Sequence, residues 1–189
     1  TSGGSKSLSI GPQLSSFVSK MARIGKQPIQ AGDPNRPKLD VVIPVFDPGL
    51  PEARDGYETE GLWPELRRAE SIRFATKLKA ALETTGAFGA VRVTPDKTAT
   101  GDLYVIGKII KSNGEDVEFE IEVFDISGKR WVDETFDHEV SEGFHKNYRN
   151  KDKDPYDPAF DEAAKALVEE LSYHETEDLK KVRRLTDLR

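Results

Sequence analysis

The segment from Asp102 to Val140 constrains the fold more strongly than any other part of the chain. It holds three strand-like runs in which β-branched and aromatic residues recur at alternate positions, at Asp102–Lys111, Val117–Asp125 and Arg130–Val140. The runs are separated by two residue pairs that favour the backbone conformation of a tight hairpin turn, Asn113-Gly114 and Ser127-Gly128. Three strands joined by two such turns predict a three-stranded antiparallel meander.

The segments before the meander add a helix and two shorter strands. A proline at position 64 and a glycine at position 86 bracket a helical pattern, with Phe74, Leu78 and Leu82 on one stripe. Short β-rich runs precede and follow this helix, at 39–46 and 90–94. The pattern predicts an α+β fold, a mostly antiparallel four- to five-stranded sheet with a helix packed on one face and extra C-terminal helices.

Composition and the positions of proline and glycine divide the chain of 189 residues into three parts. Residues 1–38 are rich in Gly, Ser and Pro and are typical of a flexible tether. Residues 39–173 form the α/β domain, whose second helix begins near Asp157, a potential N-cap, with Pro158 in the first turn. Residues 174–189 form a short basic C-terminal helix.

Strand alternation produces an acidic face on the meander. Val117, Phe119 and Ile121 point toward the core, so Glu118, Glu120 and Glu122 share the opposite face with Asp133. Counting across a two-residue turn at Ser127-Gly128 sets Phe124 opposite Trp131, beside the carboxylates. Counting in the same way across Asn113-Gly114 places three aliphatic residues on the acidic side: Leu103, Val105 and Ile109.

A face that mixes carboxylates with apolar side chains is expected to be covered. Two kinds of cover remain open. The chain could cover itself with its basic C-terminal helix or its tether, or a partner protein or a second subunit could do so. The candidate contact residues are Trp63, which joins a long loop to the first helix, and Glu118, Glu120, Glu122, Phe124, Trp131 and Asp133.

Two motifs carry a resemblance to a known group of domains. DLYVIGKII at 102–110 is similar to the phrase D-x-Y-V-x-G-x-I that opens the meander in that group, and VFDISGKRW at 123–131 is similar to its V-x-D-x-x-G-x-x-W hairpin. With the element order, these motifs resemble the small α/β domain shared by the TolB N-terminal region, the curli secretion lipoprotein CsgG and the penicillin-binding-protein activator LpoB. The long loop at 47–63 and the C-terminal helices depart from the group, and no pore-forming hairpin is visible.

The resemblance implies a setting and no catalytic residue. It implies a bacterial periplasmic lipoprotein held at the outer membrane, working through protein contacts, with ring assembly in parts of the group. The opening TSGGSKSLS resembles the segment that follows the lipid-bearing cysteine of such lipoproteins. A lipid anchor on a preceding cysteine is therefore an expectation, beside the alternative of a trimmed N-terminus.

The residues themselves argue against several classes of chemistry. Cysteine is absent, and the 28 basic residues are outnumbered by 34 acidic ones, which does not suit a nucleic-acid partner. His138 and His145 lack the spacing of a helical metal pair. The aspartates near residue 154 could invite calcium but lack the spacing of a calcium loop, and a helix cap is the preferred interpretation: Asp152, Asp154, Asp157 and Asp161. No cofactor and no metal is predicted.

The function predicted from the sequence is a non-enzymatic periplasmic lipoprotein that supports assembly of a larger envelope complex, as an oligomer subunit. Three alternatives stay open. One is a monomeric regulator of a cell-wall synthase. Another is a glycan-binding module, which requires Trp63 and Trp131 to be exposed. The third is a metal-dependent enzyme that uses His138 or His145.

Overall fold

The computed structural model describes residues 34–52 and 63–189. Most of the predicted tether, residues 1–33, and the centre of the long loop, residues 53–62, lie outside the described part. The order of elements after the tether matches the expected one, beginning with a strand, a helix and a second strand.

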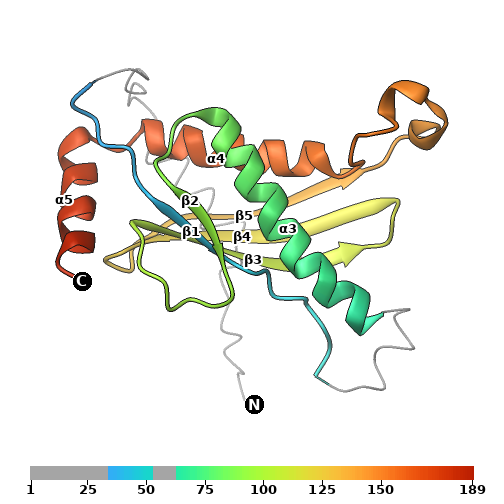
Figure 1. Cartoon of the computed structure of the whole chain (residues 1–189), viewed down its shortest axis with the longest axis horizontal. Coiled ribbons are helices and arrows are strands. Elements are labelled where there is room, and N and C mark those ends of the chain that lie inside the picture. The colour runs from blue at the N-terminus through green and yellow to red at the C-terminus, as the bar shows by residue number, and fades with distance from the viewer. Residues whose placement is uncertain (1–33, 53–62) are drawn as a thin grey trace, which may run out of the picture.

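A five-stranded sheet forms the centre of the protein (Figure 1). The strand order across the sheet is β2-β1-β3-β4-β5, and β1 is parallel to both of its neighbours. The last three strands form the predicted antiparallel meander. The α+β class is therefore confirmed. The strands are β1 Val41–Pro44, β2 Val91–Thr94, β3 Leu103–Ser112, β4 Asp116–Asp125 and β5 Arg130–Glu139.

Two helices cover one face of this sheet, and a third lies at its end (Figure 1). The covering helices are α3, Pro64–Thr85, and α4, Asp157–Ser172, which also pack against each other. α3 begins and ends where the sequence predicts, because Pro64 suits a first turn and Gly86 adopts a left-handed φ of 67°. α5, Thr176–Asp187, stands beside the sheet end where β1 begins.

The core centres on Phe119 of β4, which is fully buried. Four other phenylalanine rings surround it, with centroids at 5.9 Å for Phe46 and Phe136, 6.1 Å for Phe74 and 4.9 Å for Phe160. These residues come from the segment after β1, from α3 and α4, and from β5. One aromatic cluster thus joins the sheet to both covering helices.

The glycine of the DLYVIGKII motif has a steric role. The segment after β1 returns to β3 at Asp47, whose N–H donates to the Gly107 carbonyl over 2.8 Å. The ring of the preceding residue, Phe46, packs on Gly107, where an added Cβ would meet three ring carbons at 2.5–2.6 Å. A larger residue at position 107 would displace this central aromatic ring.

The predicted register between β3 and β4 is wrong by one residue. The connecting turn has four residues rather than two, since Ser112 pairs with Val117, and a β-bulge follows between Ile109 and Lys111. Together they shift the register of β3 against β4 by one residue, so each β3 side chain lies on the face opposite to the predicted one. Leu103, Val105 and Ile109 are consequently buried in the core, and the residues that share the acidic face are Tyr104, Ile106 and Lys108.

Candidate interaction surface

The carboxylates of β4 form a row on the sheet face opposite α3 and α4. Glu118, Glu120 and Glu122 alternate along the strand with fully or nearly fully buried core residues, and each is half-buried. We call this face, with the facing residues of β3 and β5, the acidic face. The alternation predicted it correctly because β4 is regular along this stretch.

Three pairs of like charges lie directly opposite each other on the acidic face, and one of them, Asp116 with Glu139, has Lys111 beside its aspartate. Glu122 pairs with Asp133, and Arg130 lies 3.7 Å and 3.2 Å from their carboxylates. Glu118 pairs with Asp137, and in the described ranges no cation lies within salt-bridge distance of either carboxylate. Directly opposed like charges destabilise a sheet, so the pair of Glu118 and Asp137 keeps an unfavourable arrangement.

The β3 side supplies cations that reduce the negative charge only in part. Lys108 lies opposite Glu120 in the register. Lys111 lies opposite Glu118, but its Nζ atom contacts the Asp116 carboxylate at 3.0 Å. That hydrogen bond raises the pKa of Lys111 and lowers the pKa of Asp116. Lys111 is therefore engaged at the turn rather than between Glu118 and Asp137.

A shallow hollow of about 320 Å³ opens on this face where the chain leaves β1. The residues that line it include Ile106, Gly107 and Lys108 of β3 and Glu120 and Glu122 of β4. Sequence reasoning missed Ile106 and Lys108 because nothing in the sequence marks the four-residue turn and the bulge that turn them to this side. This lining combines the apolar Ile106 with charges of both signs, which suits a basic side chain with an apolar stem.

Trp131 does not lie on the acidic face, contrary to the predicted pairing. A β-bulge between Val123 and Phe124 sets Phe124 opposite Arg130 and turns Trp131 to the helix side, where it is 5% exposed. Phe124 stays on the acidic face and is half-buried. Trp131 is therefore too buried to be a contact residue. The glycan-binding alternative requires both Trp63 and Trp131 to be exposed, and only Trp63 is.

Trp131 instead belongs to a buried cluster of hydrogen-bonded and stacked side chains at the hairpin between β4 and β5. Its Nε1–H donates to Asp125 Oδ2 over 2.9 Å, and its ring stacks on His174 with centroids 3.8 Å apart. The other oxygen of Asp125 accepts from Ser127 and Lys129 across a turn in which Gly128 has a φ of 87°. The Asp, Gly and Trp of VFDISGKRW are thus structural residues.

Trp63 is exposed at the start of α3. It directly precedes α3 and keeps 76% of its surface accessible, and Leu66 one turn later keeps 58%. It therefore remains a candidate contact residue of its own.

The basic C-terminal helix does not cover the acidic face. Its buried residues, Leu179 and Val182, enter the main core at the end of the sheet. Arg183 places Nη1 3.0 Å from the Asp102 carboxylate and 3.2 Å from that of Asp40. The interpretation that this helix neutralises the glutamates of β4 is wrong, because the helix meets a different pair of acids. The alternative cover, residues 1–33, lies outside the described part.

No group of three or more His, Cys, Asp or Glu side chains is placed to hold a metal ion within the described residues. Asp154 is fixed by cations, because it forms ion pairs with Arg73 and Lys77 of α3. Asp157 lies in the first turn of α4 rather than at its N-cap, which is Tyr156, so the predicted cap was wrong. Across the described ranges no helix is long and apolar enough to span a membrane.

The lowered pKa of Asp154 is expected to make the stability of the protein depend on pH. Burial raises its pKa, but a hydrogen bond from the Tyr156 N–H and the charges of Arg73 and Lys77 lower it by more. Its contribution is thus present above the unfolded pKa of about 3.9 and is lost as the pH falls through the lower folded value. We expect Asp154→Asn to cost about 1 kcal/mol at pH 7, a difference in the urea unfolding free energy that shrinks toward pH 2. The exposed neighbour variant Asp152→Asn should change stability little at either pH; a constant Asp154→Asn deficit would contradict the assignment.

Comparisons with known proteins leave the family of this chain open. No protein-family model matches the sequence, and no curated protein matches it. A solved structure of a hypothetical protein from Chlamydia trachomatis is similar with a TM-score of 0.37 and 13% identity, covering 72% of this chain and 98% of that one.

Proposed function

We propose that this protein is a non-catalytic assembly factor of the bacterial cell envelope that works as an oligomer through the acidic face. The observation that carries the proposal is the opposed pair Glu118 and Asp137, which lies on the sheet face opposite α3 and α4 and has no cation of the described residues within salt-bridge distance. A basic group from another subunit would relieve this repulsion. The envelope setting and the lipid anchor rest on the two sequence motifs and on the opening segment.

The surface has the composition of a contact site. Half-buried Tyr104, Ile106 and Phe124 provide apolar area beside the carboxylates. The hollow that Ile106 and Gly107 help to line provides a depression into which a partner side chain can fit. Interfaces combine such apolar patches with charges that fix orientation. A basic, partly apolar segment of a neighbouring subunit fits both requirements.

The test is a charge reversal that the fold itself should tolerate. In the double variant Glu118→Lys with Glu122→Lys, each new lysine faces an aspartate across the ladder, Asp137 or Asp133. Glu120 is left unchanged because neither of its cross-strand partners, Lys108 and Thr135, is acidic. We expect the wild-type mass, measured by light scattering on a sizing column, to be a multiple of 21.1 kDa and the variant to run as a monomer.

A matched control reverses two exposed acids of α4, Glu162→Lys with Glu169→Lys, and should keep the wild-type mass. Circular dichroism of both variants should match the wild type. A wild-type monomer would favour the alternative of a regulator that binds a different protein, and an oligomer unaffected by the acidic-face reversal would overturn the proposed contact surface.

A further inference from the structure

The loop between β5 and α4 concentrates positive charge in an acidic protein. Residues 144–153, FHKNYRNKDK, contain four Lys or Arg residues and one Asp, whereas the whole chain has a net charge of −6. In the part of the chain that the structure describes, none of these four cations forms an ion pair. We call this segment the basic loop; its cations are Lys146, Arg149, Lys151 and Lys153.

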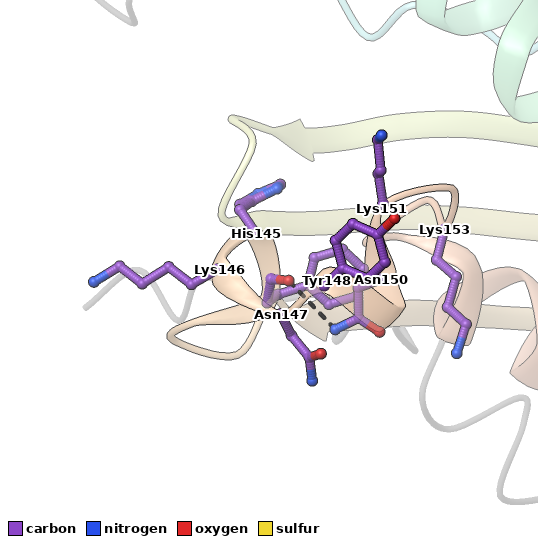
Figure 2. A pocket seen from close by; sticks show the side chains of 8 residues that line it. His145, Lys146, Asn147, Tyr148, Asn150, Lys151 and Lys153 are labelled. Carbon is purple, nitrogen blue, oxygen red and sulfur yellow. Dashed lines mark hydrogen bonds between the residues drawn. The ribbon is translucent and has the colours of Figure 1, made fainter.

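The basic loop is built to keep these cations exposed. Two short 3-10 turns, η1 Phe144–Lys146 and η2 Tyr148–Asn150, fold it around a hollow of about 340 Å³. The Asn147 side chain accepts from the Arg149 N–H over 3.0 Å. The Asn150 amide donates to the Phe144 carbonyl over 3.3 Å (Figure 2). Asparagines thus support the loop internally and leave its cations to solvent.

An exposed aromatic ring lies among the cations. Tyr148 keeps 84% of its surface accessible, and Lys151 Nζ lies 5.8 Å from its ring centroid. In Figure 2 the side chains of Lys146, Lys151 and Lys153 extend in different directions around Tyr148. Spread ammonium groups do not converge on one compact ion; they match separate negative charges distributed over a surface.

The position of the loop suits contact with an extended surface. It protrudes at one end of the long axis of the molecule, opposite the end that carries α5 (Figure 1). Tyrosine is enriched at the boundary between lipid and water, where its ring is apolar and its hydroxyl is hydrated. Lysine and arginine beside an anionic leaflet each add electrostatic attraction.

We propose that the basic loop docks on the phosphate headgroups of an anionic phospholipid surface, with Tyr148 at the headgroup level and the four cations around it. This site is independent of the acidic face and of the oligomer. It requires no conformational change in the core, because the loop joins β5 and α4 outside the packed region.

Vesicle co-sedimentation of the full chain tests the proposal. We expect binding to phosphatidylglycerol vesicles, no binding to phosphatidylcholine vesicles, and loss of binding as salt rises. Neutralising the loop with Lys146→Gln, Arg149→Gln, Lys151→Gln and Lys153→Gln should weaken binding at least about tenfold. The single variant Tyr148→Ala should weaken it by a smaller factor without changing the net charge.

The matched control neutralises four cations outside the loop, Lys165, Lys180, Lys181 and Arg184, each to Gln, and should bind as the wild type does. Equal weakening by both quadruple variants would overturn the assignment to the loop, as would equal binding to both vesicle types. Binding of free tripolyphosphate that competes fully with the vesicles, together with wild-type binding by Tyr148→Ala, would replace the lipid surface with a soluble phosphate ligand.

Discussion

Replacing Phe119 with alanine is expected to remove about 3–5 kcal/mol from the free energy of unfolding. Phe119 is fully buried and its ring meets the rings of Phe46, Phe74, Phe136 and Phe160, so the truncation would leave a cavity at the junction of the sheet and both covering helices. Urea unfolding followed by tryptophan fluorescence measures the change. A loss of this size is a large part of the 5–15 kcal/mol that holds an ordinary domain together.

A milder substitution and a same-strand control make this prediction decisive. Phe119→Leu preserves most of the volume and should cost roughly 1 kcal/mol, which keeps the test informative if the alanine variant does not fold. Phe124→Ala removes the same ring from the other face of β4, where the side chain is half-buried, and should cost clearly less than Phe119→Ala. Similar losses at positions 119 and 124 would contradict the assignment of the core face.

Replacing Arg183 with methionine is expected to cost about 2 kcal/mol. The carboxylate of Asp102 is fully buried and accepts from the Asp40 N–H and from Arg183 Nη1, so loss of the guanidinium would leave a buried charge with one backbone donor. A pair enclosed on both sides would cost more, but Arg183 keeps 42% of its side chain exposed, which reduces the effect. The shift in the urea midpoint measures this loss.

The neighbouring residue supplies the control for this substitution. Arg184 is exposed on the same helix, so Arg184→Met changes the net charge equally and should leave stability within about 0.5 kcal/mol of the wild type. Equal effects at positions 183 and 184 would show that Asp102 does not depend on its ion pair. A selective effect at 183 would establish that α5 is fastened to the sheet end by charge as well as by Leu179.

The local signals in the sequence were sufficient for the elements and for half of the acidic face. Proline and glycine marked both ends of α3, and strict alternation in β4 placed Glu118, Glu120 and Glu122 on one side. These predictions succeeded because they depend on residues that are neighbours along one element. The Asp133 position followed because the β4 and β5 register is regular from Asp116 to Val123.

The errors in the predicted faces of the sheet arose where two strands meet. A bulge in β3 and a four-residue turn moved Leu103 to the core, and a second bulge moved Trp131 there. Bulges depend on tertiary packing and carry no distinct residue signature, so counting from a turn cannot detect them. The same limit applies to the hollow beside Ile106, whose walls come from segments far apart in the sequence.

The place of β1 in the sheet has a consequence for synthesis of the chain. Both neighbours of β1 are made later, since Val41 pairs with Val91 on one side and with Leu103 on the other. At roughly 5–20 residues per second, the ribosome needs roughly 3–12 seconds to extend the chain from the first strand to the third. During that interval an apolar strand has two open edges, the state in which nascent chains aggregate or engage chaperones. The yield of folded protein should therefore depend on how quickly the ribosome passes the long segment that contains α3.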